Sequence, residues 1–168
     1  MILKIFGAAT VVVCCSLIGI RCAGVYSQRV KTLRALIGTL TVARSEICDL
    51  LSPIPELFEL LSHSAPAAAK GFWRDCDRLI RAGLGIPEAW KTAADGIRYI
   101  DETCREAVSG LAGVIGRYDA EAQRDEITRT VGILEKALAD AESERGGRSR
   151  TCAALGVAVG VMLAIILV

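Results

Sequence analysis

The residue types that most often carry out catalysis are present in this chain, but their spacing forms no recognisable catalytic motif. Its carboxylates occur in three groups, at Asp75/Asp77, at Asp101/Glu102/Glu106 and at Asp119/Glu121/Asp125/Glu126. General acid–base chemistry needs such groups inside a pocket that shifts their pKa values. Here they alternate with arginines, a pattern that is typical of a solvated helix face. We therefore expect surface carboxylates and a protein that is not an enzyme.

The thiols are equally weak candidates for chemistry. The seven cysteines form no C-x-x-C motif and the chain has one histidine, His63, which argues against a zinc site. Cys76 or Cys104 with His63 would make a nucleophile–base pair, but no flanking sequence supports one. Single cysteines within helical patterns are more often small, reduced core residues. We expect no metal and no cofactor.

Two glycine series also need an explanation. Gly110, Gly113 and Gly116 follow no strand and precede no Lys-Ser/Thr pair, so they do not form a phosphate-binding loop. Each helical glycine costs about 1 kcal/mol relative to alanine, and we interpret the three as a close helix crossing. Gly156 and Gly160 form a G-x-x-x-G pattern. This pattern either packs a transmembrane helix against another or reflects the abundance of glycine in membrane helices.

Charge is concentrated in the middle of the chain, and Lys4 is the one charged side chain before the first apolar stretch. All 19 acidic residues lie between positions 46 and 144, whereas residues 5–20 and 152–168 are uncharged and apolar. At about 1.5 Å per residue the first stretch covers about 24 Å, and residues 22–26 with snorkelling basic flanks extend it towards the bilayer core of about 30 Å. The net charge of +1 argues against nucleic-acid binding, which needs a clustered positive excess.

Each apolar stretch has a competing interpretation. The first is also compatible with a signal peptide, although no A-x-A cleavage pattern follows it, and the second with a buried terminal helix. Most Lys and Arg residues lie between the two stretches, and cytoplasmic segments carry the Lys/Arg excess. We therefore expect transmembrane helices at 1–24 and 151–168, and a cytoplasmic helical domain at 25–150.

The middle segment has helical periodicity and no strand alternation. Apolar residues recur at three- and four-residue steps from Leu33 to Leu51, and Pro53 and Pro55 end that pattern. Shorter helices are predicted around Phe58, after Pro66 and from Pro87. The whole predicts an all-α bundle of about six helices between the two terminal transmembrane helices.

The last two predicted helices are the longest and are expected to form an antiparallel pair. Each has an apolar seam, formed by Ile97, Ile100, Cys104, Val108, Leu111, Ile115 and Tyr118 in one and by Ile127, Val131, Leu134, Leu138 and Ala141 in the other. Asp119 is placed to cap the second helix. For partner binding we select residues of the exposed basic and acidic faces, namely Arg29, Lys31, Arg34, Arg44, Asp119 and Gln123, and for transmembrane packing Gly156 and Gly160.

The order of these features matches a known pattern along essentially the full chain. A basic amphipathic helix follows the N-terminal span, and then come SPIPELFELL (52–61), EAW (88–90), and the stretch with Leu111, Gly116, Asp119 and Gln123. A long charged helix and a terminal apolar run complete it. In this arrangement the chain resembles the stage III sporulation protein AB family of endospore-forming bacteria.

The resemblance implies a scaffold in the membrane of the mother cell, within the channel that joins mother cell and forespore. The head would be similar to the cytoplasmic domains of type II secretion and type IV pilus platform proteins. Its implied partners are membrane lipid, a cytoplasmic secretion-type ATPase of the same operon and other channel components. A homo-oligomer also remains an option. The alternative function is a generic membrane-anchored helical adaptor or regulator unrelated to secretion.

Overall fold

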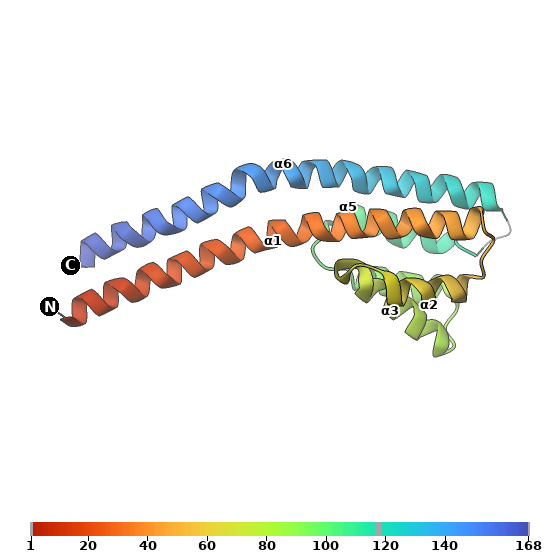
Figure 1. Cartoon of the computed structure of the whole chain (residues 1–168), viewed down its shortest axis with the longest axis horizontal. Coiled ribbons are helices and arrows are strands. Elements are labelled where there is room, and N and C mark those ends of the chain that lie inside the picture. Colours follow the sequence, from red (N-terminus) through yellow and green to blue (C-terminus); the bar gives the residue numbers. More distant parts are fainter. Residues whose placement is uncertain (1, 117–118, 168) are drawn as a thin grey trace. The chain divides into compact units, whose positions relative to one another are not determined.

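A computed structural model of the chain describes the backbone of residues 2–116 and 119–167 and the side chains of residues 24–116 and 119–144. Within these ranges all regular structure is helical (Figure 1). The elements are α1 (Ile2–Cys48), α2 (Ile54–Ser64), α3 (Ala67–Arg81), α4 (Ile86–Asp95), α5 (Glu102–Gly110), the 3-10 helix η1 (Leu111–Gly113) and α6 (Ala120–Leu167). The prediction of an all-α chain with about six helices is confirmed for this part of the chain.

The chain divides into two compact units. One comprises residues 1–28 and 140–168, and the other, which we call the head, comprises residues 29–139. Apart from Gly24, the predicted transmembrane helices at 1–24 and 151–168, including Gly156 and Gly160, lie outside the residues whose side chains are described. Within the described residues, no helix has an apolar stretch sufficient to cross a membrane.

In the head, α1 and α6 run antiparallel to one another. The Arg44 guanidinium on α1 donates to Thr128 Oγ1 on α6 at 3.2 Å, and nearer the end of α1 the Cys48 thiol lies 3.5 Å from the carbonyl oxygen of Ala120. In the head both helices bury large aliphatic side chains, namely Leu33, Leu36 and Leu40 on α1 and Ile127 and Leu134 on α6. Burial of these large aliphatic side chains, about 1.5–3 kcal/mol each, stabilises the head.

The prediction of one long helix from Ile97 to Tyr118 is wrong. Only α5 and η1 form there, because Asp101 caps the start of α5 and Gly116, at φ +86°, ends the segment. The seam residues of this segment are still buried, but they come from a loop, a short helix and a 3-10 turn: Ile97, Ile100, Cys104, Val108, Leu111 and Ile115. Tyr118 lies outside the described residues. The long antiparallel pair is therefore α1 with α6.

Four aromatic rings hold the short helices together. Phe58 from α2, Phe72 and Trp73 from α3 and Trp90 from α4 are buried, and Phe72 meets both indoles edge-on with centroid distances of 4.8 and 4.9 Å. Edge-to-face pairs of this kind add about 0.5–1.5 kcal/mol beyond burial. The cluster gives α4 a fixed position in the head.

The apolar stripe of α1 ends earlier than its sequence pattern predicts. α1 stops at Cys48, and Leu50 and Leu51 are 66% and 73% exposed. Leu51 has φ +55°, in the left-handed region. The chain leaves the helix axis at this point, so the last two leucines of the periodic pattern no longer face the core.

Candidate docking groove between α4 and α5

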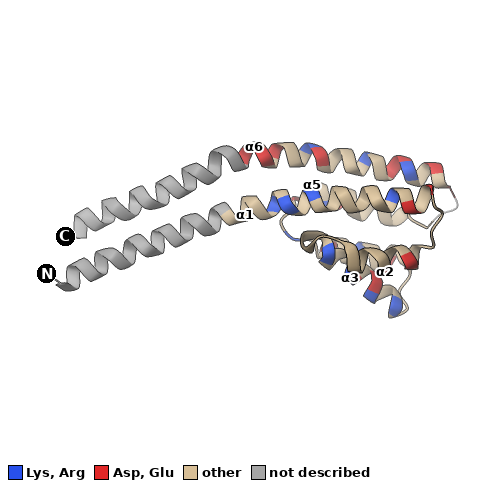
Figure 2. Ribbon diagram, viewed as in Figure 1, with Lys and Arg blue, Asp and Glu red and all other residues tan. Residues whose placement is uncertain are grey.

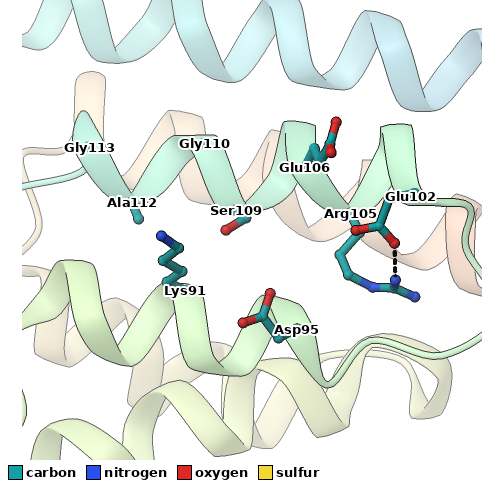
Figure 3. A pocket seen from close by; sticks show the side chains of 9 residues that line it. All are labelled: Lys91, Asp95, Glu102, Arg105, Glu106, Ser109, Gly110, Ala112 and Gly113. Atoms are coloured by element: carbon teal, nitrogen blue, oxygen red, sulfur yellow. Dashed lines mark hydrogen bonds and ion pairs between the residues drawn. The ribbon is translucent and has the colours of Figure 1, made fainter.

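An open groove of about 500 Å³ lies between α4 and α5 (Figure 3). Its lining comes from α4 (Lys91, Asp95), from α5 (Glu102, Arg105, Glu106, Ser109, Gly110) and from η1 (Ala112, Gly113). The Lys91 side chain extends from α4 towards Ser109 and Ala112 on the opposite wall (Figure 3). The groove therefore combines charged walls with a stretch of small residues.

A buried hydrogen bond from Trp90 connects the α4 and α5 walls of the groove. The indole N–H donates to the carbonyl oxygen of Val108 at 2.7 Å, and both residues are buried. Lys91 follows Trp90, and Ser109 follows Val108, so this buried hydrogen bond connects a side chain of α4 to the α5 backbone next to the groove residues. The groove thus has a fixed width before any partner arrives, which lowers the entropic cost of binding.

The groove offers charges of both signs. Arg105 is committed within the head, because Nη1 pairs with Glu102 at 2.5 Å and Nη2 donates to the Ile97 carbonyl oxygen at 3.3 Å. The exposed side chains of Lys91, Asp95 and Glu106 make no ion pair or hydrogen bond among the described residues. These groups are available to a partner with complementary charges.

The glycines of the groove do not mark a close helix crossing, and that prediction is wrong. A methyl group added at Gly110 or Gly113 would meet nothing within 4 Å. Both residues instead leave backbone accessible in the wall of the groove. Gly116 has a different role, since its φ of +86° is a conformation that L side chains rarely adopt.

The carboxylates considered for acid–base chemistry lie in separate places. Asp101 is the N-cap of α5, where Oδ1 accepts the Cys104 N–H at 2.9 Å. Asp119 caps α6 as predicted, with Oδ1 accepting the N–H groups of Glu121 and Ala122 at 3.1 Å. Glu106 lines the groove. Asp101 and Asp119 thus serve helix starts, and they do not form one site with Glu106.

Cys76 and Cys104 are buried core residues, as predicted, whereas Cys48 at the end of α1 is only partly buried. Burial, followed by the hydrogen bond and charge of Asp101, raises the pKa of Cys104 to about 12. Burial, followed by the charge of Asp75, also raises the pKa of Cys76 well above its usual value. Both thiols stay protonated at neutral pH, which disfavours nucleophilic chemistry. Among the described residues no three potential ligands are grouped to hold a metal ion.

The residues selected from the sequence for partner binding do not form one site. Asp119 and Gln123 lie at the start of α6, and Gln123 is 4% exposed, with Oε1 accepting the Gly116 N–H at 3.2 Å. Gln123 thus secures a turn and does not belong to an exposed face. Arg44 bridges α1 and α6 through Thr128.

The other three selected residues lie on α1 where it enters the head, a segment in which the ribbon of α1 is coloured blue for basic residues (Figure 2). Arg29 pairs with Asp101 at 2.6 Å, and Lys31 and Arg34 are exposed. None of the six selected residues lines the groove. The surface around Arg29 and the groove are therefore separate features of the head.

Sequence reasoning missed Lys91, Asp95 and Ser109. The available signal was the pattern of α4, in which Ala89, Trp90, Ala93 and Ala94 are buried and leave Lys91 and Asp95 on the opposite side. The second signal was the series of small residues Ser109, Gly110, Ala112 and Gly113, interrupted only by Leu111. Neither signal predicts that the exposed side of α4 faces residues 109–113, because that arrangement depends on the hydrogen bond between Trp90 and Val108.

Comparison with known proteins identifies the family. The family model described as stage III sporulation protein AB matches residues 4–168. The chain belongs to the stage III sporulation protein AB family. It is similar to stage III sporulation protein AB of Bacillus subtilis (strain 168), with 22% identity over 169 residues that cover 98% of this chain and 99% of that protein. No solved structure gives a significant match.

The predicted family is therefore confirmed, and its description names a sporulation protein and not an enzyme class. The residues that carried the resemblance to the stage III sporulation protein AB family have structural roles in the head. Pro53 precedes the first residue of α2, Trp90 belongs to the aromatic cluster, and Gln123 secures Gly116.

Proposed function

We propose that this protein is a non-enzymatic membrane platform of the channel between mother cell and forespore. Both apolar ends of the sequence cross the membrane of the mother cell, and the head lies in the cytoplasm. Three observations support this proposal: the family to which the chain belongs, the confinement of acidic residues to positions 46–144, and the basic residues that follow the first apolar stretch.

The head docks a cytoplasmic secretion-type ATPase, and the observation that carries this part of the proposal is the α4–α5 groove. Its width is set by a buried hydrogen bond, and three of its charged side chains have no partner among the described residues. A protein surface with a basic side chain for Asp95 and Glu106 and an acidic one for Lys91 would complement it. Complementary charges of this kind fix partner choice and accelerate association.

A protein partner fits this groove better than a small substrate does. Ligand pockets are mostly apolar and enclose the greater part of their ligand, whereas this groove is open and its exposed side chains carry charge. The accessible backbone at Gly110 and Gly113 allows the side chains of a partner to approach closely.

Charge reversal tests the docking proposal. Full-length protein in lipid nanodiscs is titrated with the purified ATPase, and Lys91→Glu with Asp95→Lys should weaken binding about tenfold or more, since like charges then face each other. The matched control reverses Lys136 and Asp140, which have the same spacing on α6, are exposed and do not line the groove. Equal affinities of the groove variant and the control would refute docking at this groove.

A further inference from the structure

The loop between α4 and α5 presents two exposed side chains between two buried ones. Ile97 and Ile100 are 7% and 8% exposed, whereas Arg98 is exposed and Tyr99 is 48% exposed. The isoleucines fix both ends of this short segment to the core. Arg98 and Tyr99 therefore project from an anchored base.

Tyr99 is held in an unfavourable backbone conformation. Its φ is +64°, in the left-handed region, which costs an L-residue other than glycine about 1–2 kcal/mol. Because the Tyr99 ring is about half exposed, its packing within the head offsets little of this conformational cost. Strain of this kind persists where the surrounding structure imposes it and is concentrated at functional contacts. Leu51 also has a positive φ and is exposed, so these two features do not identify a contact by themselves, and the position of the loop decides.

The position of the loop indicates what Tyr99 contacts. Asp101 directly follows the loop, and its Oδ2 accepts a hydrogen bond from Arg29 Nη2 of α1 at 2.6 Å. In the sequence, Arg29 is the third residue after Tyr26, where the extended first apolar stretch ends. The loop is thus held against the segment of α1 that begins the head, and in the sequence this segment immediately follows the proposed membrane span.

We propose that the Arg98–Tyr99 loop rests on the cytoplasmic surface of the bilayer. The Tyr99 ring lies at the level of the lipid headgroups, where tyrosine is enriched because it combines an apolar body with a polar tip. The Arg98 guanidinium binds lipid phosphate, for which its forked donors are suited. This inference rests on the membrane anchorage in the proposed function. It adds a contact of the head itself with lipid to the anchorage through the two apolar ends of the chain.

The charges around the loop are compatible with such a surface. The two carboxylates that follow the loop in the sequence are paired within the head, Asp101 with Arg29 and Glu102 with Arg105. Asp95 is the carboxylate that precedes the loop, and it is unpaired among the described residues. The positive charges of Arg98 and of the exposed Lys31 exceed its negative charge by one. A single excess charge adds about 1 kcal/mol at an anionic membrane, so the ring and the phosphate contact provide most of the interaction.

Fluorescence quenching tests this inference. The full-length Tyr99→Trp variant is reconstituted into phosphatidylcholine–phosphatidylglycerol vesicles whose acyl chains are brominated near the headgroup. The native Trp73 and Trp90 are 0% exposed, and the unsubstituted protein gives their background. The emission added by the new tryptophan should fall at least twofold relative to unbrominated vesicles. Arg98→Trp provides a second reporter in case the first variant fails to fold.

Leu51→Trp is the matched control. Leu51 is exposed and left-handed like Tyr99, but it follows the last turn of α1, at the opposite end of the head from Arg29. Its emission should be unaffected by bromine. The inference is overturned if the reporters at 98 and 99 are quenched no more than that at 51, or if the protein does not float with the vesicles. ATPase binding that persists in the first case leaves the proposed function standing.

Discussion

Arg29 and Asp101 form an ion pair across 72 residues of sequence, with Nη2 and Oδ2 2.6 Å apart. The same carboxylate caps α5 through the Cys104 N–H. One side chain therefore fixes both the start of α5 and its position against α1. Partial burial alone would raise the pKa of Asp101, but the hydrogen bonds from Cys104 and the charge of Arg29 outweigh burial, and its pKa is lowered.

This pKa shift predicts an acid-dependent loss of stability. Because the pKa of Asp101 is lower in the folded than in the unfolded state, its ionised form stabilises the head above about pH 4. That contribution is lost as the pH falls through the folded pKa. Asp101→Asn removes the charge, so its melting temperature should be lower than that of the unsubstituted protein at pH 7. The two should converge in strong acid, and a difference independent of pH would contradict the assignment.

Trp90→Phe tests the buried hydrogen bond behind the groove. The substitution keeps an aromatic ring in the cluster but leaves the Val108 carbonyl oxygen without its donor, which costs about 1–3 kcal/mol. The melting temperature should fall by several degrees, and ATPase binding should weaken because the groove loses its fixed width. Phe72→Leu is the control, since it disturbs the same cluster without removing that hydrogen bond. It should lower stability and change ATPase affinity less.

Alanine substitutions at Gly110 and Gly116 should change the stability of the head in different ways. Gly110→Ala should leave stability unchanged or raise it by up to about 1 kcal/mol, because the added methyl group meets no atom within 4 Å and alanine favours the helix. Gly116→Ala should lower stability by about 1 kcal/mol or more, since alanine is strained at φ +86°. Denaturant titration measures both variants. Equal effects at the two positions would show that the groove wall and the turn are misassigned.

Leu134→Asp should unfold the head. Leu134 is fully buried on the face of α6 that packs in the core, and an unpaired buried carboxylate costs more than about 3 kcal/mol. The neighbouring residue offers a control, because Glu135 is exposed and Glu135→Asp keeps its charge. Circular dichroism during heating distinguishes the two. An unchanged melting temperature for Leu134→Asp would show that this face of α6 is not the core.

The sequence predicts the helical class, the cap at Asp119 and most of the core, because apolar period, proline and capping residues act locally. It does not predict the length of α5, since the apolar series from Ile97 to Ile115 is compatible with one helix and with a loop, a short helix and a turn. The burial of Gln123 and the opposition of Lys91 to Ser109 depend on tertiary contacts between distant segments. Periodicity carries no information about such contacts, so the groove emerges only from the structure.

Crosslinking in cells tests the docking of the ATPase most directly. A photoreactive amino acid replaces Ser109, inside the groove, and the matched position is Thr103, which is exposed on the same helix and does not line the groove. Irradiation of sporulating cells should join the protein to the ATPase from position 109 and not from position 103. The absence of an ATPase adduct from position 109, or equal adducts from both positions, would contradict docking through the groove.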